Sequence, residues 1–138
     1  MQTKTHNNSS QRLLIKKQAR DQLGGLSVMF LLGMAVNLIG LPSETKGSIQ
    51  TITTILVGLH ALLGIGLIAG SILTVLRAKS SVFLKLALIG LVIIVFTFFC
   101  GVMTLNTENN WWSYAMSVGF LASFWIYGVL FVKARVEQ

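Results

Sequence analysis

The amino-acid sequence predicts an all-α protein, a four-helix transmembrane bundle with up-down-up-down topology. Four apolar stretches that contain no Lys, Arg, Asp or Glu indicate this fold, at residues 23–41, 52–76, 86–105 and 111–132. A helix of about 20 such residues, at about 1.5 Å per residue, crosses a hydrocarbon core of about 30 Å. The stretches lack the alternation of a membrane barrel, and lipid tolerates only helices or closed barrels. We therefore expect residues 23–132 to form one four-span membrane domain.

The basic residues gather on one side of this topology. Only Lys46 of the 11 Lys and Arg residues falls on the other side. The remaining ten precede the first span, lie between the second and third, or follow the fourth: Lys4, Arg12, Lys16, Lys17, Arg20, Arg77, Lys79, Lys85, Lys133 and Arg135. Such a bias is typical of cytoplasmic loops, so we expect both termini, including a short tail at 133–138, in the cytoplasm. Topology and contact with anionic lipid explain the net charge of +7, and nucleic acid is not an expected partner.

Residues 1–22 precede the first span and combine a polar tail with an amphipathic segment. The segment interleaves apolar and basic side chains: Leu13, Leu14 and Ile15 with Arg12, Lys16, Lys17 and Arg20. This pattern is typical of a helix that lies in the membrane interface. We therefore predict a short N-terminal interfacial helix, after which the chain turns into the first span at Leu23.

Polar residues inside the spans mark the faces that turn toward the middle of the bundle, because lipid contact needs only apolar atoms. Most of them fall in the half of the bundle away from the basic loops. We therefore expect an outward-facing pocket around His60, lined by Asn37, Thr53, Thr97, Thr104, Ser113 and Ser117. Tight helix packing without any ligand is the simpler explanation of the same pattern, and the sequence favours it.

His60 lies about 12 Å inside the second span, counted at 1.5 Å per residue. Ionisable residues within a membrane are costly and are treated as functional candidates. The favoured interpretation is structural: a neutral His60 hydrogen-bonds Asn37 or a hydroxyl and fixes the helix register. The alternative is a haem ligand, with Met116 or Met103 as the second axial ligand. Apart from that haem, no cofactor is expected, and no metal site is expected, since no carboxylate or second imidazole accompanies His60.

The sequence contains no Ser-His-Asp set, phosphate-binding glycine loop or nucleotide motif, so we do not expect an enzyme. The leading hypothesis is a structural or accessory membrane subunit that acts through helix–helix contacts. Its expected partners are the lipid bilayer and either further copies of itself or a larger membrane complex. A haem- or lipophilic-ligand-binding bundle centred on His60 is the second hypothesis. The third is a small oligomeric channel or transporter, which the absence of carboxylates from the spans disfavours.

Three segments carry a family resemblance, at Met34–Ile39, Leu59–Gly64 and Ser113–Phe120. On these segments the chain resembles small, uncharacterised four-span integral membrane proteins of bacteria. The resemblance covers all four spans and implies the bundle fold, the topology and a bacterial cell membrane, without implying an activity.

Overall fold

Four helices make up nearly all of the computed structural model, which describes residues 3–79, 81–107 and 110–136. They are α1 (Thr3–Ile39), α2 (Ser48–Ala78), α3 (Leu84–Asn106) and α4 (Asn110–Val136). Each contains a segment long and apolar enough to cross a membrane. The predicted all-α four-helix fold is confirmed, and the protein is a membrane-embedded bundle.

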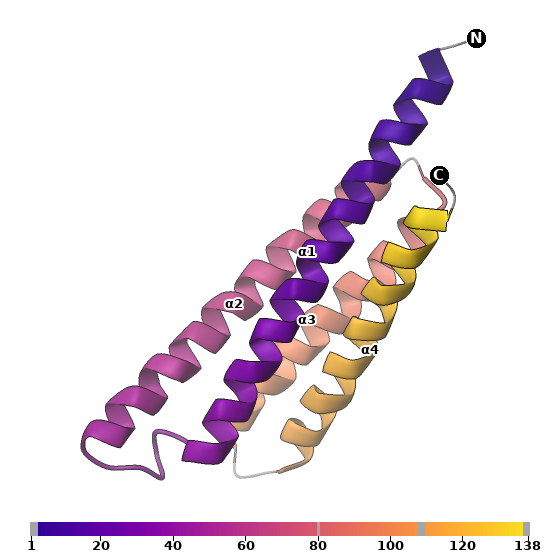
Figure 1. Ribbon diagram of the computed structural model, residues 1–138. Coiled ribbons are helices and arrows are strands. Elements are labelled where there is room, and N and C mark those ends of the chain that lie inside the picture. Colours follow the sequence, from indigo (N-terminus) through magenta and orange to yellow (C-terminus); the bar gives the residue numbers. More distant parts are fainter. Residues whose placement is uncertain (1–2, 80, 108–109, 137–138) are drawn as a thin grey trace.

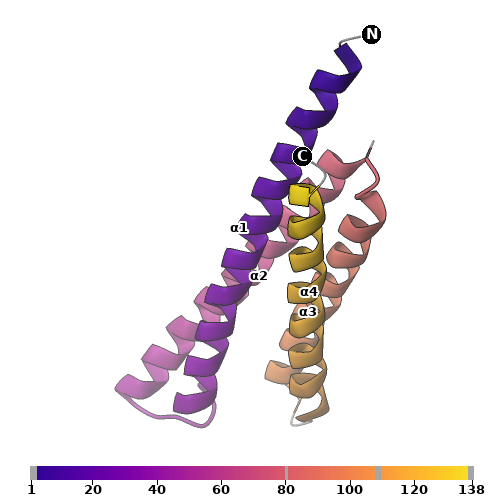
Figure 2. The ribbon, with the colours of Figure 1, turned by 45° about the vertical axis from the view of Figure 1, so that its right-hand side comes forward.

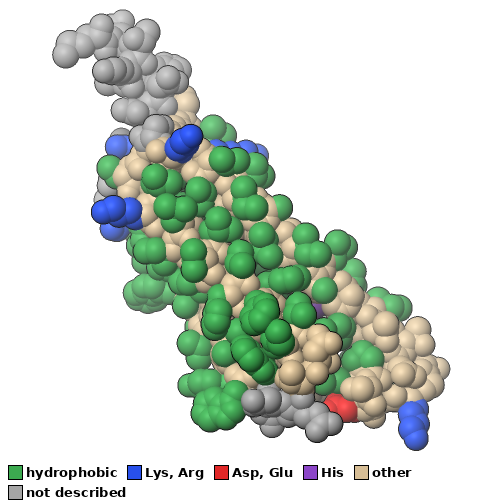
Figure 3. Space-filling model, turned by 180° about the vertical axis from the view of Figure 1, so that it is seen from behind, with side chains coloured by type: hydrophobic (Ala, Val, Ile, Leu, Met, Phe, Trp, Pro, Cys, Tyr) green, Lys and Arg blue, Asp and Glu red, His purple; other side chains and the backbone are tan. Residues whose placement is uncertain are grey.

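The helices run alternately up and down, and each contacts its neighbours in chain order (Figure 1). Contacts join α1 to α2, α2 to α3, α3 to α4 and α4 back to α1. We call the end that carries both chain termini and the α2–α3 loop the basic end, and the opposite end, with the α1–α2 and α3–α4 loops, the hairpin end. Seen from behind, Lys and Arg side chains gather at the basic end and hydrophobic side chains cover most of the length (Figure 3).

The two hairpins, α1–α2 and α3–α4, lie close together at the basic end and diverge toward the hairpin end (Figure 2). The largest fully buried apolar side chains lie near the basic end: Ile15, Phe83, Tyr127 and Leu130. A small residue also allows close approach of the helices there. A Cβ placed on Gly90 of α3 would lie 3.1 Å from the Tyr127 ring of α4. Packing is therefore tight at the basic end, where the hairpins are joined.

The structure differs from the predicted N-terminal interfacial helix. That segment is continuous with the first span in the single helix α1. Its Ile15 and Ala19 are fully buried in the bundle. Side-chain amides also fasten it to α2, because Gln11 Nε2 donates to the Arg77 carbonyl (2.7 Å) and Gln22 Nε2 donates to the Leu67 carbonyl (3.1 Å). These contacts hold the segment along α2, in line with the rest of α1.

The α1–α2 loop begins at Gly40, whose φ of +101° lies in the left-handed region that glycine tolerates. Pro42 follows two residues later and cannot continue the helix. Within the loop, Leu41 N donates to Glu44 Oε2 (3.0 Å), and the hydroxyls of Thr45 and Thr53 share a hydrogen bond of 3.1 Å. The loop is thus anchored to the first turns of α2 at the hairpin end.

Candidate functional site

A cavity of about 320 Å³ lies between the two hairpins, and its lining residues belong mainly to the half of the bundle toward the hairpin end. All four helices contribute to its wall. Its floor contains Leu26, Leu67 and Ile94, and Leu41 and Asn37 lie toward the hairpin end. Among the residues that the structure describes, no Lys, Arg, Asp or Glu lines the cavity, and most of the lining surface is apolar. The cavity thus follows from the divergence of the hairpins.

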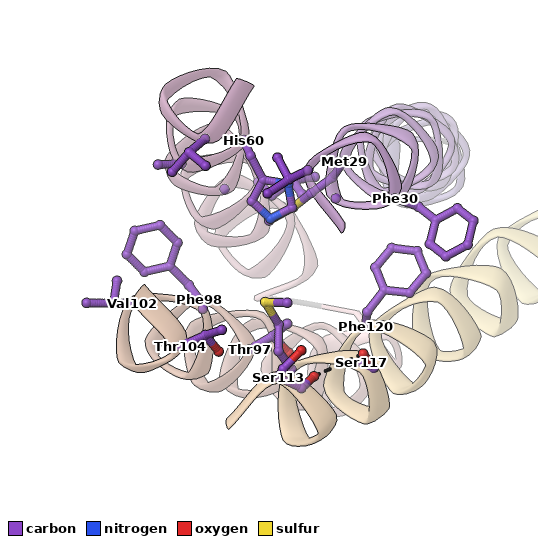
Figure 4. Close-up of a pocket in the computed structure, with 18 of the residues that line it drawn as sticks. Met29, Phe30, His60, Thr97, Phe98, Val102, Thr104, Ser113, Ser117 and Phe120 are labelled. Carbon is purple, nitrogen blue, oxygen red and sulfur yellow. Dashed lines mark hydrogen bonds between the residues drawn. The ribbon is translucent and has the colours of Figure 1, made fainter. Parts of the chain in front are cut away.

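His60 projects from α2 into the space between the helices, beside Met29 of α1 (Figure 4). A Cβ placed on Gly33 of α1 would lie 3.3 Å from Cε1 and 3.8 Å from Nδ1 of His60. The Cε1–Nδ1 edge of the imidazole therefore faces α1, and glycine at position 33 leaves room for it. Nδ1 is buried and has no hydrogen-bond partner among the described residues, so the expected bond to Asn37 or a hydroxyl is not formed at this atom.

Hydroxyl groups occupy the opposite wall. Thr97 and Thr104 of α3 and Ser113 and Ser117 of α4 lie across from His60 (Figure 4). Thr97 Oγ1 donates to the Ile93 carbonyl (2.7 Å), and Thr104 Oγ1 donates to the Cys100 carbonyl (2.9 Å). Ser117 Oγ likewise donates to the Ser113 carbonyl (3.0 Å). These protons are used within the helices, while the oxygen lone pairs remain able to accept.

Two glycine contacts set the height of His60 relative to this wall. A Cβ on Gly64 of α2 would lie 2.8 Å from the Phe98 ring of α3, and a Cβ on Gly101 would lie 3.2 Å from Met116 Sδ of α4. His60 is one turn beyond Gly64 toward the hairpin end, as Gly101 is about one turn beyond Phe98. His60 therefore lies at the same height along the bundle as Gly101 and Met116. On each facing helix, one hydroxyl residue lies above this height and one below it.

Aromatic rings line the cavity on the two sides where the hairpins face each other, between α1 and α4 and between α2 and α3. Phe30 of α1 stacks on Phe120 of α4 with ring centroids 5.4 Å apart, and Phe98 stands on the α2–α3 side. Phe30 is 49% exposed, so this side of the cavity is closed by side chains that also face the lipid. A lipophilic molecule entering from the bilayer would meet apolar rings first.

The structure brings most of the sequence-predicted site residues to this one cavity: His60, Met116, Asn37, Thr97, Thr104, Ser113 and Ser117. Two predicted residues do not line it. Thr53 is fully buried near the α1–α2 loop, where it bonds Thr45, and Met103 lies outside the lining. Sequence reasoning missed the lining residues Met29 and Phe98. Both lie against Gly64 of α2 in the structure, a contact that the sequence gives no signal for.

The position of Met116 affects the haem hypothesis, in which Met116 is a second axial ligand. His60 and Met116 line the same cavity from different hairpins, but Met116 Sδ packs toward Gly101 of α3. Within the described part of the chain, no group of three or more His, Cys, Asp and Glu side chains could hold a metal ion. A haem at this site would therefore depend on His60 and on movement of the Met116 sulfur.

Comparison of the chain with protein-family models, curated proteins and solved structures finds no match.

Proposed function

We propose that this membrane protein binds an uncharged, lipophilic small molecule in the cavity between its two hairpins, and that it acts by binding and not by catalysis. The observation that carries the proposal is the cavity itself, about 320 Å³ in volume and lined from all four helices. Ligand pockets in proteins typically measure about 300–1,000 Å³ and are mostly apolar with a few convergent polar groups. His60 and the facing hydroxyls supply such polar groups here.

The absence of charge from the lining selects the class of ligand. An ion brought into this cavity would lose its hydration and meet no side chain of opposite charge among the lining residues. A neutral lipophilic molecule loses little on leaving the bilayer for an apolar cavity. It gains close contacts with the aromatic rings that bound the site.

The accessory-subunit hypothesis remains a second proposal, in which the bundle acts through its outer helix faces on further copies or on a larger membrane complex. It gives no role to the cavity, whereas ligand binding accounts for it. The colour of the purified protein distinguishes haem binding from the binding of a colourless ligand. A Soret absorption band that disappears in folded His60→Gln would favour haem, and a colourless purified protein would exclude it.

We further propose that the basic end faces the cytoplasm of a bacterial cell, so that the cavity lies in the outer half of the membrane. The proposal is supported by the basic residues at the α2–α3 loop and near both chain ends, against Lys46 at the hairpin end. A ligand would then enter from the outer leaflet or from outside the cell.

Cysteine labelling tests this orientation in a Cys100→Ala background, which removes the buried native thiol. Cysteines at Ser43 and Thr107, both exposed at the hairpin end, should react with a membrane-impermeant maleimide in intact cells. A cysteine at Val82, which is 76% exposed in the α2–α3 loop, should react only after the cells are opened. Labelling of the Val82 variant alone in intact cells would reverse the orientation.

Photolabelling tests ligand binding without knowledge of the natural ligand. We expect a neutral trifluoromethyl-phenyl diazirine, added to the protein in lipid nanodiscs, to give saturable adducts on Phe98 and Phe120. Peptide mass spectrometry locates the adducts. Leu62 and Trp125 face the lipid and are 65% and 74% exposed. Their labelling should increase in proportion to the probe concentration without saturating. Only unsaturable adducts, confined to lipid-facing residues, would contradict the proposal.

A further inference from the structure

We infer that the ligand is a lipid alcohol: an uncharged molecule with one hydroxyl head between His60 and the opposite wall, and a hydrocarbon tail along the aromatic rings. The inference rests on the proposed binding function and names its ligand class. It follows from which hydrogen-bonding groups of the cavity remain free.

The imidazole of His60 supplies the first free group. Its Cε1–Nδ1 edge faces Gly33 of α1, so the Cδ2–Nε2 edge faces away from α1, and His60 is part of the cavity lining. In a neutral imidazole Nε2 is either an N–H donor or a lone-pair acceptor, depending on the tautomer. A head group that can both accept and donate suits either tautomer.

The facing wall supplies the second group, and it offers mainly acceptors. The hydroxyl protons of Thr104 and Ser117 are donated to carbonyls of their own helices, as is that of Thr97, whose oxygen packs against Gly119 of α4. A hydroxyl oxygen that donates its proton still carries lone pairs that accept. A ligand that offers a donor at the level of His60 therefore finds acceptors in this wall.

A hydroxyl is the smallest uncharged group that meets both demands, since it donates one proton and accepts at its oxygen. Ethers, ketones and quinones only accept, so they would bring no donor to these acceptors. Carboxylates, phosphates and ammonium groups carry charge, and none of the described residues that line the cavity is charged. An amide would bring an additional polar group into a mainly apolar space, where an unpaired group is costly.

The tail follows from the apolar part of the lining. The stacked pair Phe30 and Phe120 lies on the side between α1 and α4, and Phe30 is about half exposed. A chain that leaves the head group at His60 can run past these rings toward the lipid. The ligand is thus a molecule of the bilayer with its polar head drawn into the bundle.

A series of probes with one tail and different heads tests the inference: farnesol, farnesyl methyl ether and farnesyl phosphate. Each competes with the diazirine for the saturable site of the whole protein in nanodiscs. We expect farnesol to compete about three- to twentyfold better than the ether, which is the range of about 0.6–1.7 kcal/mol for one membrane hydrogen bond converted to affinity. The phosphate should compete least well.

Variants assign this preference to the two walls. In His60→Leu the advantage of farnesol over the ether should fall below about twofold, while His60→Gln, whose amide can donate and accept, should restore most of it. Thr104→Val removes one hydroxyl with little change of shape and should reduce the advantage from the opposite wall. Thermal unfolding shows whether each variant is folded. If His60→Leu is not folded, Thr104→Val tests the preference in its place.

The outcomes distinguish failure of the lipid-alcohol inference from failure of the proposed ligand binding. Equal competition by farnesol and its ether, or strongest competition by the phosphate, at a saturable cavity site would overturn the alcohol and leave ligand binding standing. Absence of any saturable diazirine adduct in the wild-type protein would overturn ligand binding itself, and the alcohol with it.

Discussion

Replacement of Tyr127 by alanine is expected to lower the free energy of unfolding by about 3 kcal/mol, the low end of the range for truncation of a buried aromatic ring. Tyr127 is fully buried near the basic end, and its ring packs against Gly90 of α3. The low end applies because lipid tails also solvate the unfolded side chain, so that lost packing contacts dominate. Unfolding by SDS titration in mixed micelles measures the change.

Trp125→Ala is the matched control, because it removes a larger ring from the same helix. Trp125 is 74% exposed on the lipid-facing surface, so little packing is lost with it. We expect a change below about 0.5 kcal/mol, as for ordinary surface substitutions. Equal destabilisation by the two variants would show that the bundle is not held together at its basic end by the contacts described.

Ala61→Phe is expected to abolish ligand binding while the protein stays folded. Ala61 lines the cavity from α2, one residue after His60, so a phenyl ring at this position would occupy ligand space. Saturable diazirine adducts on Phe98 and Phe120 should decrease at least about tenfold, the effect of 1.4 kcal/mol or more.

Gly58→Phe places the same ring on the same helix but outside the cavity. A Cβ on Gly58 meets nothing within 4 Å, and the residue is exposed. Its adduct yield should match that of the wild type. Loss of the adducts in both variants would indicate general damage to α2 in place of a filled cavity.

The sequence predicts the four helices well, because a membrane imposes a simple rule on composition. Charge-free stretches mark the segments that cross the hydrocarbon. They do not mark the helix ends, since a helix can continue into water or the interface. Accordingly, α2 begins at Ser48 and ends at Ala78, beyond the predicted span 52–76 on both sides.

The role of the N-terminal segment was harder to predict. Its basic and apolar residues resemble an interfacial helix, but a second pattern runs through Gln11, Ile15, Gln18, Gln22 and Leu26 at steps of three and four. That stripe continues the inner face of the first span and contacts α2 in the structure. Glutamine amides can satisfy backbone carbonyls of a neighbouring helix, so polarity at these positions did not exclude a place in the bundle.

The candidate site was predictable to the extent that polar residues must avoid lipid. This argument selects Asn37, His60 and the hydroxyl residues of α3 and α4. It cannot decide whether their faces close on one another or enclose space, because that depends on how far the hairpins diverge. Thr53 shows the limit, since it lies on the same inner face as His60 but is taken up by the α1–α2 loop.

Native mass spectrometry of the protein purified in mild detergent tests the central claim most directly. Wild type and Gly58→Phe should each carry one additional uncharged molecule, which organic extraction releases and identifies, and folded Ala61→Phe should lack it. Folded wild-type protein that carries no small molecule, or an identical bound mass in all three proteins, would contradict a ligand site between the hairpins.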